Sequence, residues 1–234
     1  MVTDTSLCGW MLCLGLACIG LAVQCFFIAV EHKKKYVAAT VLKGTASLIF
    51  VALGFLAMNF AGDKFSKLVF IGLICGAVGD VLLELRLVFP KIGSKIFLVG
   101  ILVFMAGHIL YLCALIPGCP AILWYLLGGA AVSALLLVWI LSTVEAKLAF
   151  RIFGVFYISA VTLMTALALG NLIAAPVAEK LLFFAGAVLF LVSDVVLIFN
   201  TFGKEEKYSL RITNLICYYL GQLLIALSLG VLTV

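Results

Sequence analysis

The sequence predicts an all-α, polytopic membrane protein with eight transmembrane helices, and three observations lead to this prediction. Hydrophobic residues make up 67% of the 234 positions and charged residues 11%. The mean hydropathy is +1.37, which lies far outside the range of soluble domains. The apolar residues form runs of roughly 20, the length that crosses a bilayer as a helix. All four prolines, Pro90, Pro117, Pro120 and Pro176, lie between these runs, where a missing N–H does no damage.

The eight predicted helices follow one another with short connections. In chain order they cover residues 7–30, 37–60, 67–85, 96–116, 121–143, 150–172, 178–200 and 209–233. Each connection carries prolines or basic residues, which mark the ends of the membrane spans. The runs leave no room for a soluble domain, so we expect a single transmembrane domain over residues 1–234.

The placement of basic residues predicts the orientation of the chain in the membrane. The first helix has no basic region before it and is followed directly by Lys33, Lys34 and Lys35. This charge order is typical of a retained first span with its N-terminus outside, not of a cleaved signal peptide.

With this orientation the odd-numbered connections hold eleven basic residues and the even-numbered ones three. The eleven are Lys33, Lys34, Lys35, Arg86, Lys91, Lys95, Lys147, Arg151, Lys204, Lys207 and Arg211, and the three are Lys64, Lys67 and Lys180. Because Lys and Arg collect on the cytoplasmic side, both termini are predicted to be non-cytoplasmic. The membrane would be the inner membrane of a bacterial cell or the endoplasmic reticulum of a eukaryotic one.

The cysteines and the net charge indicate which ligands and partners are not expected. The eight cysteines form no C-x-x-C pair and fall almost entirely within apolar runs, so we expect small buried hydrophobic residues and not a metal or disulfide framework. The net charge of +5 does not imply nucleic acid as a partner, because the basic residues collect at the membrane surface. The sequence leaves the oligomeric state open.

Two acidic residues lie within apolar runs, and they are related by a fixed offset. An ionised carboxylate at mid-bilayer costs roughly 2.5 to 3.5 kcal/mol, so Asp80 needs a reason to be there. Asp194 follows it by 114 residues in a similar small residue, Asp, Val context, and Gly221-Gln222 follows Gly107-His108 by the same offset. We therefore predict a parallel 4+4 internal repeat with halves of about 1–116 and 117–234.

The other polar residues in the spans fall at a similar depth. At 1.5 Å per helical residue, Asp80, Lys43, Tyr157, Asp194 and Tyr218 lie about 9 to 15 Å inward from the nearest cytoplasmic charge. The last helix adds Asn214 and Gln222 on the same face as Tyr218, the fourth adds His108 and Tyr111, and Ser193 precedes Asp194. We expect a cavity open to the cytoplasmic leaflet, with an apolar extension for an acyl or alkenyl chain and basic residues at its mouth for a phosphate.

Each of these residues also has a purely structural interpretation. Lys43 could form a salt bridge with either aspartate or extend its ammonium to the interface. The tyrosines and Ser193 could make interhelical hydrogen bonds, and His108 could be a core histidine with its hydrogen bonds satisfied. Glu84 and Arg86 lie at the predicted interface, where we expect them to be solvated.

Two carboxyl groups in one low-dielectric cavity cannot both ionise cheaply, so one keeps its proton near neutral pH while the other acts as a base. Such a pair suits cleavage of an acid-labile C–O bond through an oxocarbenium-like state. It could instead carry protons or bind a cation for transport. No G-x-S-x-G motif occurs, and His108 has no H-x-x-x-H partner, so neither a nucleophilic triad nor a metal or other cofactor is expected.

Several short motifs occur together in order along the chain. They are Gly79-Asp80, Gly107-His108-x-x-Tyr111, Ser193-Asp194 and Tyr218-Tyr219-x-x-Gln222-x-x-Ile225-Ala-x-Ser228, with a lysine in the second helix. In this combination the chain resembles the YhhN-like lysoplasmalogenase family of integral membrane proteins.

The resemblance implies an eight-span hydrolase that cleaves the vinyl ether bond of lysoplasmalogens, a class of lysophospholipid. Its products are a fatty aldehyde and glycerophosphoethanolamine or glycerophosphocholine. The resemblance also implies that Asp80 and Asp194 are the catalytic pair.

We expect the remaining polar residues to hold the head group or water, with His108 and Tyr111 lining the cavity. The neighbouring Ser193 favours Asp194 as the more readily ionised acid. The alternative is a proton-coupled or lipid transporter that uses the same two aspartates.

Overall fold

The eight predicted helices are confirmed by a computed structural model, which describes residues 4–61 and 63–230. The helices are α1 (Asp4–His32), α2 (Tyr36–Ala61), α3 (Lys64–Val88), α4 (Gly93–Leu115), α5 (Ile122–Thr143), α6 (Leu148–Ala174), α7 (Ala178–Phe202) and α8 (Tyr208–Leu227), with a short 3-10 helix, η1 (Ile116–Gly118), after α4. All eight α-helices are long and apolar enough to cross a membrane. The chain is therefore an integral membrane protein.

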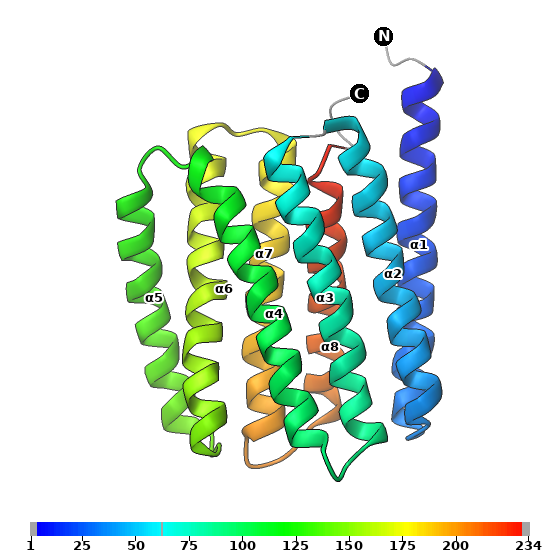
Figure 1. Ribbon diagram of the computed structural model, residues 1–234, viewed down its shortest axis with the longest axis vertical. Coiled ribbons are helices and arrows are strands. Elements are labelled where there is room, and N and C mark those ends of the chain that lie inside the picture. Colours follow the sequence, from blue (N-terminus) through cyan, green and yellow to red (C-terminus); the bar gives the residue numbers. More distant parts are fainter. Residues whose placement is uncertain (1–3, 62, 231–234) are drawn as a thin grey trace.

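The helices run side by side along one axis, as Figure 1 shows. The connections α1–α2, α3–α4, α5–α6 and α7–α8 lie together at one end of the bundle, and α1 starts and α8 ends at the other. We call the first of these the basic end, because its connections carry Lys33–Lys35, Lys91, Lys147, Lys204 and Lys207. We predict that the basic end is cytoplasmic and that both termini lie on the opposite side of the membrane. The orientation stays a prediction.

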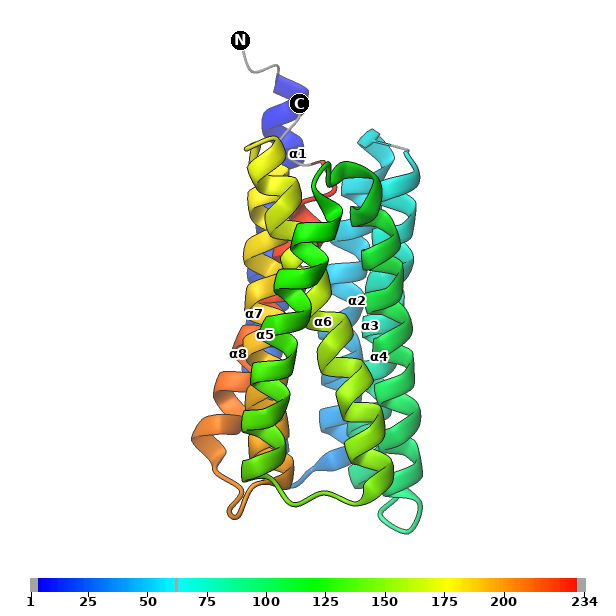
Figure 2. The ribbon, with the colours of Figure 1, turned by 90° about the vertical axis from the view of Figure 1, so that its left-hand side faces the viewer.

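Six of the helices form a ring. Around it, α2 packs on α3, α3 on α4, α4 on α6, α6 on α7, α7 on α8, and α8 on α2. The first and fifth helices lie outside the ring, with α1 mainly against α2 and α5 mainly against α6. Figure 1 shows them on opposite sides of the bundle, and Figure 2 shows α5 in the foreground of the turned view. The inside of the ring is where side chains from both halves of the chain can meet.

This order of neighbours is the one that a 4+4 repeat would give, because each contact in the first half has a counterpart in the second. Two close approaches also correspond. A side chain at Gly107 would lie 3.2 Å from the carbonyl oxygen of Gly72, and one at Gly221 would lie 2.9 Å from that of Gly186. Both pairs are related by 114 residues. The repeat itself stays a prediction, which these contacts support.

Two of the connections contain residues that suit the start of the following helix. Asp63 caps α3 by accepting a hydrogen bond from the backbone N–H of Ser66 at 2.9 Å, which satisfies one of the free donors of the first turn. Pro117 lies at the start of η1, where no backbone donor is needed.

The cysteines for which side chains are described form no disulfide. Of these seven, only Cys13 and Cys119 are buried inside the bundle, whereas Cys18, Cys25 and Cys113 are exposed on its outer surface. The prediction of buried cysteines is therefore wrong for Cys18, Cys25 and Cys113, which lie on helix faces that would contact lipid in a membrane. The side chain of Cys8 lies outside the described residues.

Three glycines of α3 leave room for large side chains on the inner face of the ring. An added methyl group at Gly72 would overlap the Tyr111 ring, and one at Gly79 would lie 2.6 Å from Phe104. At Gly76 it would lie 2.5 Å from the amide nitrogen of Gln222. The small-residue stripe therefore makes space for side chains of α4 and α8 next to Asp80.

Replacing Gly72 by alanine should destabilise the protein by about 1–3 kcal/mol, because the methyl group would displace the Tyr111 ring from a closely packed site. The matched control is Gly128→Ala in α5, which has nothing within 4 Å of the new methyl group and removes a flexible helical glycine, a change worth about 0.5–1 kcal/mol of stabilisation. Thermal unfolding of the purified variants in detergent checks this. Equal stability of the two variants would contradict the packing argument.

Candidate functional site

A cavity near the basic end brings together seven of the ten predicted site residues. It has a volume of about 90 Å³, which is room for several water molecules. Helices α2 to α8 all contribute to its wall, and the seven residues are Lys43, Asp80, Tyr157, Ser193, Asp194, Asn214 and Tyr218. Both aspartates therefore line the same cavity, although they lie 114 residues apart in the sequence.

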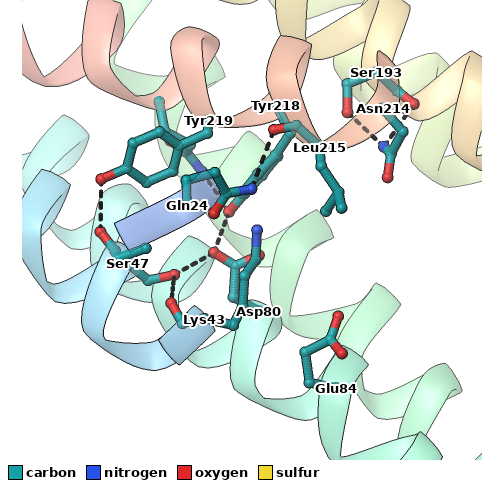
Figure 3. A network of polar contacts seen from close by, with 12 residues as sticks. Gln24, Lys43, Ser47, Asp80, Glu84, Ser193, Asn214, Leu215, Tyr218 and Tyr219 are labelled. Atoms are coloured by element: carbon teal, nitrogen blue, oxygen red, sulfur yellow. Dashed lines mark hydrogen bonds and ion pairs between the residues drawn. The ribbon is translucent and has the colours of Figure 1, made fainter. Parts of the chain in front are cut away.

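Asp80 has three donors around its carboxylate, one of them a cation. Its Oδ2 accepts hydrogen bonds from Ser47 Oγ at 2.5 Å and from Tyr218 Oη at 2.8 Å. Its Oδ1 lies 3.5 Å from the ammonium of Lys43. Figure 3 shows these groups converging from α2 and α8 on the Asp80 carboxylate of α3. Each of these donors interacts best with a negative charge, so together they offset part of the cost of ionising a buried carboxyl group.

Lys43 is held inside the protein by this carboxylate and by aromatic rings. The side chain is 2% exposed, and its Nζ lies 4.5 Å from the centroid of the Tyr218 ring and 5.3 Å from that of Phe27. A lysine ammonium over an aromatic face is attracted by the ring quadrupole. Of the two structural interpretations of Lys43, the ion pair is therefore the one the structure forms, with Asp80 as partner.

Asp194 has different surroundings. Its Oδ2 accepts a hydrogen bond from Tyr157 Oη at 2.9 Å, and no ion pair involves it within the described chain. The hydroxyl of Ser193 accepts a hydrogen bond from Asn214 Nδ2 at 2.8 Å and makes no hydrogen bond to the Asp194 carboxyl group within the described chain. The expectation that Ser193 assists ionisation of Asp194 is therefore unsupported, and of the two acids Asp80 has the better support for a charge.

The surroundings of the two acids differ at several corresponding positions, and one of these differences is a charge. Tyr157, which contacts Asp194, follows Lys43 by 114 residues, the same offset that separates Asp194 from Asp80. At corresponding positions of the two halves, one acid thus has an ammonium beside it and the other has a neutral phenol. This difference lets two equivalent carboxyl groups take different protonation states.

The three other predicted residues lie behind the cavity and not on its wall. Gln222 Nε2 donates to Tyr218 Oη at 3.1 Å, and His108 Nε2 lies 3.3 Å from Tyr157 Oη. Because Tyr157 donates its one hydrogen to Asp194, its oxygen can only accept from His108. The ring of Tyr111 packs against His108 with centroids 6.0 Å apart. His108 and Gln222 thus orient the two tyrosines, and Tyr111 packs against His108. The expectation that His108 and Tyr111 line the cavity is wrong.

His108 also does not join the aspartates as a metal ligand. Its Nε2 faces a phenol, and within residues 4–61 and 63–230 no group of three or more His, Cys, Asp and Glu side chains has an arrangement that could hold a metal ion.

Comparison with known proteins identifies the family. The model of the YhhN family matches residues 38–229, which include every residue of the cavity wall. The chain belongs to the YhhN family. Neither a comparison with curated proteins nor one with solved structures found a match.

Three residues of the site in this YhhN-family protein were missed or misplaced by sequence reasoning. Ser47 was not singled out, although it follows Lys43 by four residues and so shares its helix face. Glu84 was predicted to lie at the membrane interface and Arg211 in a connection. Both residues line the cavity. Glu84 is 2% exposed, and its Oε1 accepts a hydrogen bond from Arg211 Nη2 at 2.8 Å.

The prediction that both Glu84 and Arg86 are solvated is therefore wrong for Glu84, whereas Arg86 is partly exposed. Glu84 is buried, and the guanidinium of Arg86 lies 4.2 Å from the centroid of the Phe97 ring, with its Nε buried. The helix carrying them continues to Val88, beyond the apolar run, and packing by neighbouring helices covers its last turns. The sequence did contain one indication for Glu84: it follows Asp80 by four residues, so the two side chains share a helix face.

The cavity of the YhhN-family protein is polar on one side and apolar on the other. The charged residues come from α2, α3, α7 and α8, apart from the exposed Arg151 of α6. The apolar wall comes from α5, the start of α6 and the end of α7, and includes Leu137, Ile140, Leu141, Val144, Phe150 and Phe202. An amphipathic molecule would therefore find both a polar and an apolar surface.

A second cavity of about 690 Å³ lies toward the opposite end of the bundle. Its wall includes Asp63, Lys64, Asn171, Glu179 and Lys180, and none of the ten predicted site residues. The predicted site residues that line a cavity are thus all near the basic end.

Proposed function

We propose that this YhhN-family protein is a membrane hydrolase that cleaves the vinyl ether bond of lysoplasmalogens. Its substrates would be lysoplasmenylethanolamine and lysoplasmenylcholine, and its products a fatty aldehyde and the glycerophospho-base. One observation carries the proposal: two buried aspartates line one cavity, and only one of them has a cation beside it. Such a pair supplies an acid and a base without a cofactor.

In this proposal Asp194 is the general acid and Asp80 the general base. Asp80 is ionised because Lys43, Ser47 and Tyr218 all stabilise a negative charge there. Asp194 keeps its proton because burial disfavours a second charge and no cation offsets it. This assignment reverses the one that Ser193 favoured in the sequence.

The reaction begins with transfer of the Asp194 proton to the β-carbon of the vinyl ether, which places positive charge on the ether-bearing carbon. The Asp80 carboxylate stabilises this charge and then takes a proton from a water molecule as its oxygen attacks that carbon. The product of this step is a hemiacetal, with Asp194 ionised and Asp80 protonated.

Collapse of the hemiacetal restores both groups. Asp194 takes the proton of the hemiacetal hydroxyl, the C–O bond to glycerol breaks, and Asp80 returns its proton to the departing glycerol oxygen. The sum is one water consumed, one aldehyde and one alcohol formed, with no change in oxidation state.

The rest of the cavity supports these steps. Tyr157 and Tyr218 hold the two carboxyl groups in place, and His108 and Gln222 in turn hold the tyrosines. Asn214 fixes Ser193 next to Asp194. The apolar wall from α5 to α7 would take the alkenyl chain, and the cavity that both acids line has room for the attacking water.

The direct test is to incubate the purified protein in detergent with lysoplasmenylethanolamine and to measure free aldehyde. The proposal requires aldehyde formation in the absence of added metal or cofactor. A proton-coupled or lipid transporter built on the same aspartates needs a sealed vesicle and would release no aldehyde. Absence of aldehyde with both ethanolamine and choline substrates would exclude the hydrolase.

A further inference from the structure

Glu84 presents a buried carboxylate oxygen that lacks a partner. The side chain is 2% exposed and lines the cavity. Its Oε1 accepts from Arg211, but its Oε2 is buried with no hydrogen-bond partner. A buried acceptor without a donor is costly, so an oxygen of this kind in a cavity wall calls for a ligand with a donor.

Within the described chain, Glu84 shares its one ion-pair partner, Arg211, with a second carboxylate. Arg86 and Lys43 act on it only from longer range. Arg211 binds Glu31 through two of its nitrogens, with Nη2 at 2.6 Å, and the same nitrogen binds Glu84 at 2.8 Å. One guanidinium thus neutralises only one of two carboxylates. Arg86 makes no ion pair with Glu84 within the described chain, and its guanidinium lies over the Phe97 ring. The unpaired oxygen therefore favours a cation.

Glu84 is placed one helical turn from the reacting groups. It follows Asp80 by four residues on α3, about 6 Å along the axis toward the basic end, and both side chains line the cavity. Figure 3 shows Glu84 on the same helix as Asp80 but apart from its hydrogen-bond network. A molecule whose reactive bond lies at Asp80 would extend its next polar groups toward Glu84.

Arg151 adds an opposite charge to the same end of the cavity. It is exposed and lines the cavity, and its side chain makes no hydrogen bond or ion pair within the described chain. A free guanidinium at a cavity rim can bind a phosphate through two N–H groups at once. The rim thus offers an anion site on α6 and a cation site on α3.

We propose that Glu84 binds the ammonium group of a lysophospholipid head group while Arg151 contacts its phosphate, so that the site selects cationic over uncharged or anionic head groups. The inference rests on the proposed function, because it names the substrate class of that site. It adds a specificity residue that takes no part in proton transfer. A head group without a cation would leave the Glu84 carboxylate buried without a counter-charge from the ligand, which is the source of the discrimination.

The test compares two lysophospholipids that differ at the head group and carry an acyl ester in place of the vinyl ether. Equilibrium binding to the purified protein in detergent is measured for lysophosphatidylethanolamine and lysophosphatidylglycerol. The wild-type protein should bind the first at least about 10-fold more tightly, the effect of one hydrogen bond to a charged group. Glu84→Gln should reduce this preference to within about 2-fold, because it replaces the charge and retains an acceptor for Arg211.

Glu31→Gln is the matched control. It removes the same charge from the other partner of Arg211, but Glu31 is not on the cavity wall, so the preference should persist. Glu84→Asp serves as a second variant if Glu84→Gln does not fold, and its shortened carboxylate should keep part of the preference.

Two results would overturn the inference: equal binding of the two lipids by the wild-type protein, or a preference that survives in Glu84→Gln. Because neither lipid has a vinyl ether, the outcome is independent of turnover. Aldehyde release without a head-group preference would refute only the role of Glu84, and a Glu84-dependent preference without aldehyde release would refute only the hydrolase.

Discussion

Replacing Asp194 by asparagine should lower the rate of aldehyde release about 10²- to 10⁴-fold, the contribution of a general acid. The amide cannot donate a proton to carbon, yet it can still accept the hydrogen bond from Tyr157. The fold should therefore persist while the first step of the reaction fails. Asp80→Asn should cause a loss of similar size, because the attacking water would have no base. Initial rates with lysoplasmenylethanolamine measure both effects.

The matched control for both variants is Asp63→Asn. Asp63 is the cap of α3 and lies at the other cavity, and asparagine is an equally good cap, so its rate should equal that of the wild-type protein. Helicity by circular dichroism and elution from a sizing column show whether each variant is folded. Turnover within a few fold of wild type in a folded Asp194→Asn variant would remove this residue from the role of acid.

Replacing Lys43 by methionine should destabilise the protein by about 3–5 kcal/mol, the effect of removing one partner from a buried ion pair. Without the ammonium, the Asp80 carboxylate stays buried with only neutral donors, Ser47 and Tyr218. The double variant Lys43→Met, Asp80→Asn should recover most of this loss, because no buried charge remains. Unfolding by denaturant in mixed micelles gives the free energies.

The exposed Lys95 provides the control, since Lys95→Met should change stability by less than about 0.5 kcal/mol. Additive effects of the Lys43 and Asp80 substitutions would show that the two side chains do not stabilise each other. The single Lys43→Met variant should also lose activity, because Asp80 then binds a proton and cannot act as a base.

The sequence was a reliable guide to the helices because the bilayer imposes a length and an apolar composition on each span. The same constraint made Asp80 and Asp194 conspicuous, since charges are costly in apolar runs. Seven of the ten residues predicted for the site lie on one cavity, which reflects their similar depth along parallel helices. Depth along a helix can be estimated from the distance to its end, and it sets which side chains are level with one another.

Rotation about each helix and the order of neighbours were not predictable in this way. Glu84 was misjudged because neighbouring helices cover the end of α3. His108, Tyr111 and Gln222 lie behind the cavity wall because they are deeper in the bundle. Gln222, for example, shares a helix face with Tyr218 but follows it by four residues, about 6 Å farther from the basic end.

By itself the sequence determined the number of helices, their approximate extents and the two acids that a membrane span carries only at a cost. The tertiary structure alone decided that Lys43 lies beside Asp80 and a tyrosine beside Asp194. The physical reason is that a charge in a low-dielectric interior depends on the few groups within about 4 Å of it. Those groups come from other helices, and which helices become neighbours is a property of the packed bundle and not of any one segment.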